Sequence, residues 1–190
     1  ILESATQRLL LERGDIDIAR DLNPEDVAGA RAEDGIKISD ELNGRLMYVS
    51  LGQQHPDLAK PQVRQAIKYL IDYEGMQDRF LKGQYTIHQN FLPLTYLGSV
   101  KENPFSLNVE KAKALLAEAG VDGLELTAGV REAQERLEIA QSLQNTFAQA
   151  GIKLNLTVGT AKQVLGMYRA RELDVYIGAW GPDYPDPQTN

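Results

Sequence analysis

The tightest constraint on the fold is a strict alternation of apolar and polar residues over positions 152–158, Ile-Lys-Leu-Asn-Leu-Thr-Val. A period of two residues indicates a half-buried β-strand. Gly159 and Thr160 then turn the chain, and Thr160 is well placed to cap a helix over 161–171. A second strand is expected over 173–179, so this stretch predicts a strand–helix–strand unit with parallel strands.

The preceding segment continues the alternation of helices and strands. Positions 134–150 carry apolar residues at helical spacing, and Gly151 supplies the residue type that commonly follows a helix C-terminus. A strand is expected over 124–130, and Asn108 is expected to cap a helix that ends near Gly120. This half of the chain therefore predicts an α/β fold.

The first half of the chain is less regular. Pro61 suits the first position of a helix with a broad apolar stripe, and a shorter helical stretch is expected at 76–81. Residues 85–107 show no periodicity, and long irregular segments are often functional. The first sixty residues predict short elements: helices at 4–12 and 24–31, the second capped by Asn23, and strands at 16–19, 36–39 and 45–51.

No internal repeat and no shift in composition divides the chain, so residues 1–190 are predicted to form a single domain. The expected fold class is α/β, with a mixed sheet flanked by helices. No apolar run reaches the roughly 18 residues that span a bilayer. Residues 1–12 are amphipathic rather than a signal peptide, so the chain is expected to be a piece of a longer polypeptide.

Charge and composition exclude several function classes. The net charge is -7 and basic residues do not cluster, which argues against a nucleic-acid partner. The absence of cysteine excludes disulfides and thiolate metal sites, and His55 and His88 are not spaced as metal ligands. No metal, cofactor or nucleic acid is therefore expected.

The segment at 179–187, Ala-Trp-Gly-Pro-Asp-Tyr-Pro-Asp-Pro, is the feature most suggestive of a site. Its three prolines predict a stiff, extended ledge that leaves the carboxyl end of the last strand, which is the edge where open α/β sheets bind ligands. We call this segment the ledge. Its aromatic and carboxylate side chains suit a ligand with an apolar body and a cationic group. A rigid exit loop with Trp180 packed in the core fits the same composition equally well.

An enzyme is not indicated by the residues. Asp183 and Asp186 lack the nearby partner that a general acid–base pair needs, and the ledge lacks the ligand ladder of a calcium loop. Neither a nucleophile elbow nor a glycine-rich phosphate loop is present. We therefore expect no catalytic residues, although a carboxylate-dependent hydrolase stays open as a minor alternative.

Four segments resemble one family in order along the chain: residues 14–27, the helix 61–76 (PQVRQAIKYLIDYEGM), the helix 108–120 (NVEKAKALLAEAG), and 150–187 with its W-x-x-D-Y-P-D-P ending. This family is the extracellular solute-binding proteins of the dipeptide/oligopeptide/nickel class, family 5. The resemblance implies a type II, cluster C periplasmic-binding-protein-like fold, with this chain as the C-terminal ligand-binding lobe of a two-lobed receptor.

The resemblance also implies a function and a site. The receptor would act outside the cytoplasm, in the periplasm or anchored to the membrane of a Gram-positive host. As a monomer it would deliver peptides to the permease subunits of an ABC transporter. Asp183 would bind the ligand's α-ammonium group, Trp180 and Tyr184 would form the cleft wall, and Ala179 and Gly181 would contact the ligand through their backbones. A different solute, such as a sugar, an opine-like compound or a nickel chelate, is the main alternative.

Overall fold

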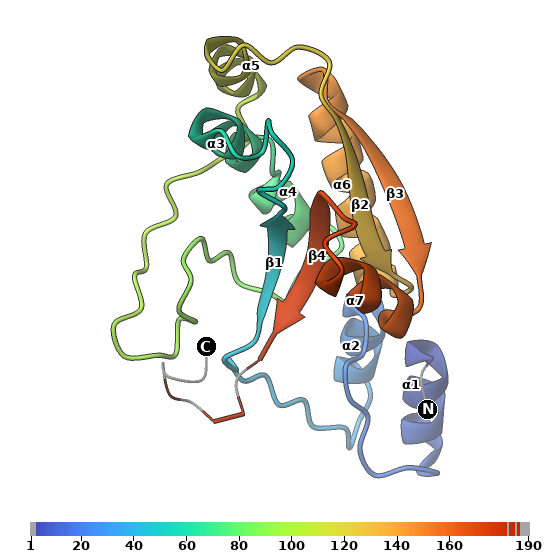
Figure 1. Ribbon diagram of the computed structural model, residues 1–190. Coiled ribbons are helices and arrows are strands. Elements are labelled where there is room, and N and C mark those ends of the chain that lie inside the picture. Colours follow the sequence, from blue (N-terminus) through green and yellow to red (C-terminus); the bar gives the residue numbers. More distant parts are fainter. Residues whose placement is uncertain (1–2, 182, 185, 187–190) are drawn as a thin grey trace.

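The computed structural model describes residues 3–181, 183, 184 and 186 (Figure 1). No helix in this part of the chain is long and apolar enough to cross a membrane. The elements, in chain order, are α1 (Ser4–Arg13), α2 (Pro24–Arg31), β1 (Leu46–Leu51), α3 (Pro61–Tyr69), α4 (Tyr73–Asp78), α5 (Val109–Glu118), β2 (Glu125–Arg131), α6 (Gln134–Gln149), β3 (Lys153–Gly159), α7 (Ala161–Arg169) and β4 (Val175–Trp180).

The four strands form one mixed sheet in the order β1-β4-β2-β3. β2 runs parallel to both β3 and β4, whereas β1 is antiparallel to β4. The predicted strand–helix–strand unit is confirmed as β3–α7–β4, with β2 lying between its two strands. The predicted α/β class with a mixed sheet flanked by helices is likewise confirmed.

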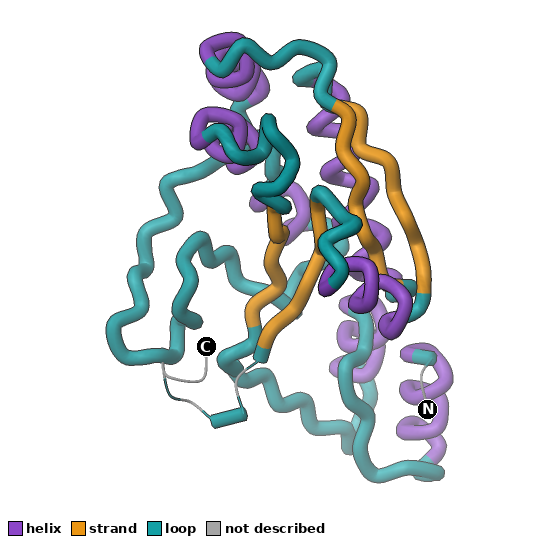
Figure 2. Tube along the Cα trace, viewed as in Figure 1, coloured by secondary structure: helices purple, strands orange, loops and turns teal. Residues whose placement is uncertain are grey.

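The helices cover the two faces of the sheet. α6 lies on one face and α7 on the other, as Figures 1 and 2 show. The larger hydrophobic core lies on the α6 face and reaches α3 and α5, and its fully buried side chains include Leu58, Ile67, Leu126, Leu143, Phe147 and Ile177. A smaller cluster on the α7 face consists of Val164, Leu173 and Tyr176, with partly buried tyrosines around it.

Local capping signals explain several helix starts. The side chain of Asn23 accepts a hydrogen bond from the backbone N–H of Asp26, and the side chain of Asn108 accepts one from Lys111. Thr160 and Gln163 form a capping box at the start of α7. Each of these three caps was predicted from the sequence alone.

Two predicted strands were wrong. Residues 16–19 and 36–39 form no strand, and the side chain of Ile18 is 75% exposed. A short apolar run becomes a strand only where the fold supplies a pairing partner, and neither segment pairs with any of the four strands of the sheet.

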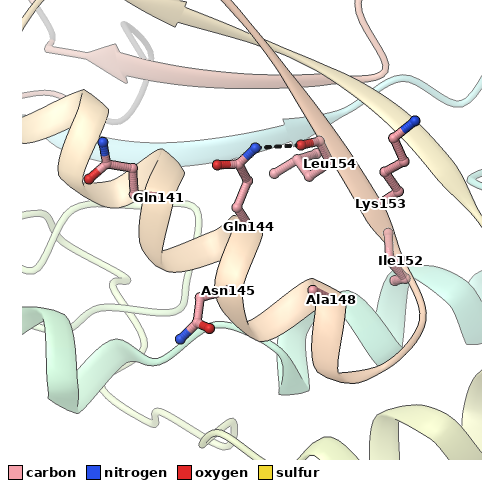
Figure 3. A pocket seen from close by; sticks show the side chains of 7 residues that line it. All are labelled: Gln141, Gln144, Asn145, Ala148, Ile152, Lys153 and Leu154. Atoms are coloured by element: carbon pink, nitrogen blue, oxygen red, sulfur yellow. Dashed lines mark hydrogen bonds between the residues drawn. The ribbon is translucent and has the colours of Figure 1, made fainter.

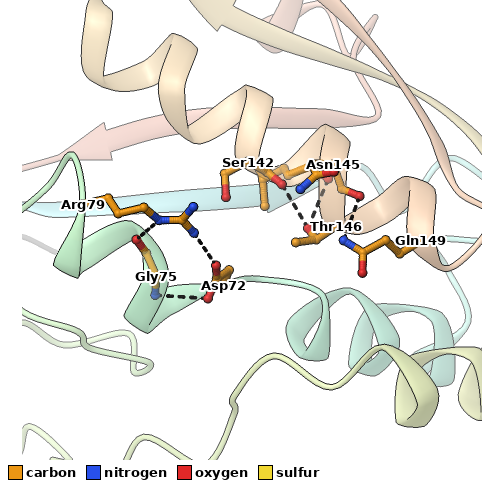
Figure 4. Close-up of polar contacts among 8 residues, drawn as sticks. Asp72, Gly75, Arg79, Ser142, Asn145, Thr146 and Gln149 are labelled. Atoms are coloured by element: carbon orange, nitrogen blue, oxygen red, sulfur yellow. Dashed lines mark hydrogen bonds and ion pairs between the residues drawn. The ribbon is translucent and has the colours of Figure 1, made fainter.

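The helical stretch expected at 76–81 begins earlier, as α4. Asp72 caps it by accepting a hydrogen bond from the N–H of Gly75, and Arg79 forms an ion pair with Asp72 at 2.8 Å (Figure 4). The Asp72 carboxylate therefore fixes where α4 begins, a few residues before the apolar pattern suggested.

Candidate functional site

The last strand, β4, passes from the core to the surface. Its first four residues are buried, Ala179 is half-buried and Trp180 is 53% exposed. Trp180 is therefore not a core residue, and the interpretation of the ledge as an exit loop with a buried tryptophan is ruled out. An exposed aromatic side chain at a strand end is suited to contact a ligand or a partner.

The position of β4 in the sheet identifies the edge at which a ligand would bind. From β2 the chain crosses through α6 to β3 on one side, and then through α7 to β4 on the other. The crossover helices lie on opposite faces, so the direction of winding reverses between β2 and β4. In open α/β sheets, ligands bind outside the carboxyl ends of strands at such a reversal.

The sheet also opens at this point. β2 and β4 pair only at Ala128 with Val175 and at Gly129 with Tyr176, although both strands continue further. Beyond Tyr176 the strand β4 keeps its partner β1 but loses β2. The carboxyl ends of β2 and β4 thus frame a gap in the backbone ladder, and the ledge begins beside it.

Aromatic side chains line the α7 face of β4 up to Trp180. Tyr176 stacks on Tyr168 with ring centroids 4.3 Å apart and meets Tyr48 edge to face at 6.4 Å. Tyr48 lies across Gly178, because a Cβ atom at position 178 would come within 2.6 Å of the Tyr48 hydroxyl oxygen. Since side chains alternate along a strand, Tyr176 and Trp180 share this face.

Three predicted site residues follow on the ledge. Gly181, Asp183 and Tyr184 are all exposed, and Tyr184 is 56% exposed. The carbonyl oxygen of Tyr184 accepts hydrogen bonds from the Asp186 N–H at 2.8 Å and from the Tyr96 hydroxyl at 3.3 Å. The prolines at 182, 185 and 187, which led us to expect a stiff ledge, lie outside the described residues.

Arg131 is a candidate that the sequence did not single out. It is the last residue of β2, so it lies at the same edge as Trp180, and its Nε is buried without a hydrogen-bond partner among the described residues. Gly129, two residues earlier, faces Val164 of α7, which places Arg131 on the α7 face as well. An unpaired, partly buried guanidinium is suited to receive an anionic group. The sequence signal that could have identified Arg131 is its position as a positively charged residue directly after a predicted strand.

A second arginine supports the end of β4 from the opposite face. Arg136 is 3% exposed, and its Nη1 donates a 2.7 Å hydrogen bond to the carbonyl oxygen of Ile177. Burial, followed by the nearby charge of Arg131, lowers the pKa of Arg136, while Glu135 opposes this shift. Arg45 adds a third positive charge, because its aliphatic part lies beside Gly181. Three arginines thus lie around the carboxyl ends of β2 and β4, together with Glu135, which is 3.9 Å from Arg136, and Asp183 follows on the ledge.

Other possible sites are weaker. The described residues contain no cluster of three histidine, aspartate or glutamate side chains that would hold a metal ion. A shallow hollow of about 430 Å³ lies between α6 and β3, where Gln144 donates a hydrogen bond to the carbonyl of Leu154 (Figure 3). None of its lining residues belongs to the ledge.

Comparison with known proteins identifies relatives over the whole chain. The family model of the bacterial extracellular solute-binding proteins, family 5 middle region, matches residues 1–190. The chain is 30% identical to the "Probable di/tripeptide-binding protein 5" of Pseudomonas aeruginosa, over 93% of this chain and 34% of that protein.

Solved structures share the fold. The periplasmic binding protein DppA of Helicobacter pylori, in complex with the peptide STSA, superposes with a TM-score of 0.90 at 24% identity, over 100% of this chain and 37% of that one. The PBP AgaA of A. tumefaciens R10, in complex with agropinic acid, has a TM-score of 0.77 at 26% identity, over 97% and 38% of the two chains. The chain spans 32 to 36% of the length of the curated relatives, so each of them is a much longer protein.

Proposed function

The chain belongs to the bacterial extracellular solute-binding proteins of family 5, and on this premise we propose that residues 1–190 form the C-terminal lobe of a two-lobed receptor for peptides. The receptor captures its ligand outside the cytoplasm and delivers it, chemically unchanged, to the permease of an ABC transporter. The observation that carries this proposal is the exposed ledge beside the gap between β2 and β4. It offers half of a binding surface.

The ledge supplies a partner for each part of a peptide's amino-terminal end. Asp183 accepts hydrogen bonds from the α-ammonium group, and the extended backbone at Ala179 and Gly181 pairs with the peptide backbone as an added strand does. Trp180 and Tyr184 enclose the first side chain, and Arg131 balances the negative charge of a short peptide's carboxylate.

An open lobe alone binds weakly. An ammonium–carboxylate pair exposed to water is worth about 0–1 kcal/mol. A second lobe that closes over Asp183 excludes water and strengthens the pair, provided that further hydrogen bonds offset the desolvation of both charges. High affinity therefore requires closure of both lobes, as in hinge-type switches.

The choice of a peptide over another solute rests on the relatives. The relative at 30% identity is named for di- and tripeptides, whereas AgaA, which shares this fold over 38% of its chain, was solved in complex with agropinic acid. Asp183 favours a ligand with an ammonium group. Mass spectrometry of ligand co-purified with the full-length receptor separates the two cases, because a sugar or a nickel chelate carries no α-ammonium group.

The decisive experiment compares alanyl-alanine with its N-acetylated form on the full-length receptor. We expect Asp183→Asn to weaken alanyl-alanine binding by about tenfold or more and to leave the N-acetylated peptide unaffected. Asp122→Asn, an exposed carboxylate remote from the ledge in the sequence, is the control. Unchanged calorimetric affinity of Asp183→Asn for alanyl-alanine would remove Asp183 from the site.

A further inference from the structure

The long segment between α4 and α5 contains no helix or strand and is connected by side-chain hydrogen bonds instead (Figure 2). We call residues 85–107 the strap. Within it, the side-chain amide of Gln89 donates a hydrogen bond to the backbone carbonyl of Phe105 at 2.7 Å and accepts one from its backbone N–H at 2.8 Å. Asn103 accepts from the N–H of Gln89 at 2.9 Å, and Asn90 donates to the carbonyl of Glu102 at 2.9 Å. Side-chain amides thus replace a backbone ladder and hold the two arms of the strap together.

The strap is attached at its base to the helix that follows β2. The hydroxyl of Tyr85 donates to the Glu135 carboxylate at 3.0 Å, and Glu135 lies in the first turn of α6. Burial, and then the charge of Glu135, raises the pKa of Tyr85 to about 12. The phenol therefore keeps its proton, and with it this contact, at neutral pH.

Near its tip the strap is attached to the ledge. Tyr96 is 5% exposed, and its hydroxyl donates to the carbonyl oxygen of Tyr184, which also accepts the N–H of Asp186. The next residue of the strap, Leu97, is 90% exposed. A buried tyrosine beside a fully exposed leucine indicates that the Tyr96 side chain is directed inward, onto the ledge.

We propose that the strap holds Asp183 and Tyr184 in their binding conformation and that Tyr96 is the positioning residue for Asp183. Tyr96 binds the backbone of the residue directly after Asp183, so it acts on the carboxylate through the main chain. An Asp183 carboxylate that is positioned before the ligand arrives loses less conformational entropy on binding, and this raises affinity. The inference rests on the proposed function, because it assigns Tyr96 to the ammonium site at Asp183.

The test uses the full-length receptor with the Tyr96→Phe substitution, which removes one hydroxyl and keeps the ring. Tyr73→Phe is the matched control: Tyr73 is a partly buried phenol whose hydroxyl has no hydrogen-bond partner among the described residues. Calorimetric titration with alanyl-alanine and with N-acetyl-alanyl-alanine gives the ratio of the two affinities, and thermal melting gives the stability of each variant.

We expect Tyr96→Phe to weaken alanyl-alanine binding about 2- to 12-fold, the effect of one neutral hydrogen bond, and to leave the N-acetylated peptide nearly unchanged. The affinity ratio then falls in Tyr96→Phe and stays at the wild-type value in Tyr73→Phe. Tyr85→Phe, which releases the base of the strap, should lower the ratio in the same direction.

The outcomes separate the two proposals. A wild-type receptor that does not distinguish the two peptides overturns the role of Asp183, whatever Tyr96 does. If the wild type distinguishes them, an unchanged ratio in Tyr96→Phe overturns the role of Tyr96 alone. Equal weakening of both peptides together with a lower melting temperature shows that Tyr96 only stabilises the fold, and it overturns the inference as well.

Discussion

Arg136 and Ile177 are joined by a 2.7 Å hydrogen bond from the guanidinium Nη1 to the backbone carbonyl oxygen. Ile177 is the first residue of β4 beyond the last pair with β2, so the arginine contacts β4 where that strand partner ends. Placing the positive charge of Arg136 here costs free energy, because the residue is 3% exposed and lies in the first turn of α6, where the helix dipole is positive. The contact ties α6 to the strand that carries the ledge.

Replacing Arg136 with methionine should destabilise the protein by about 0.5–2.7 kcal/mol. The loss of a hydrogen bond from a charged donor costs about 1.5–3 kcal/mol, and relief of the unfavourable helix dipole returns about 0.3–1 kcal/mol. Urea unfolding measures the difference. Arg169→Met, at an exposed position of α7, is the control. A more stable Arg136→Met variant would mean that desolvation of the guanidinium outweighs its hydrogen bond.

Gly178 should not tolerate a methyl group. A Cβ atom there would meet the Tyr48 hydroxyl at 2.6 Å and the Tyr176 ring at 2.7 Å, so Gly178→Ala must displace an aromatic ring, at a cost of about 1–3 kcal/mol. Gly166→Ala is the matched control, because a Cβ atom there meets nothing within 4 Å and the site is inside α7. The free energy of unfolding of Gly166→Ala, measured by chemical denaturation, should rise by about 0.5–1 kcal/mol. Equal effects of the two substitutions would contradict this packing.

Gly181→Ala should separate folding from binding. A Cβ atom at this position would lie 3.7 Å from the side chain of Arg45, an ordinary contact, so the unfolding free energy should stay within about 0.5 kcal/mol of the wild type. If Gly181 lies against the ligand backbone, as proposed, the methyl group weakens peptide binding in the full-length receptor. A variant that keeps both stability and affinity would exclude a close backbone approach at Gly181.

Stability should fall in alkaline solution because of Tyr73 and Tyr85. Burial raises the pKa of Tyr73 to about 12, and burial together with Glu135 raises that of Tyr85 to about 12. The unfolded chain releases these protons near pH 10, so their contribution is complete below about pH 10 and is lost as the pH rises towards 12. Urea midpoints between about pH 9 and about pH 11.5 should fall less steeply in Tyr73→Phe and in Tyr85→Phe than in the wild type. Parallel curves for all three proteins would refute the assignment.

The features that the sequence predicted correctly depend on neighbouring residues. Asn23, Asn108 and Thr160 act on backbone groups three residues away, so a short window of sequence contains both partners. The alternation at 152–158 likewise reports which face of one strand is buried. The ledge was proposed as a binding site from the same kind of local signal, because its prolines and aromatic residues are contiguous in the sequence, and that role stays a prediction.

The features that were missed depend on contacts between distant residues. Arg131 joins the proposed site only because β4 lies beside β2 in the sheet, and Tyr96 reaches Tyr184 across 88 positions. The incorrect prediction of a strand at 16–19 has the same cause. The local pattern of this segment suits a strand, but no other strand pairs with it. Strand order and loop attachment are set by the whole fold and leave little trace in any one segment.

Because Trp180 is half-exposed, its intrinsic fluorescence reports on the environment of the ledge. It is the single tryptophan among the 190 residues, so all indole emission of the isolated chain arises at the end of β4. A ligand that binds at the ledge changes the solvent exposure of this indole ring. The emission maximum of the fluorescence and its quenching by solutes change with it. Ligand binding at the ledge can thus be followed by intrinsic tryptophan fluorescence, without a dye or an engineered label.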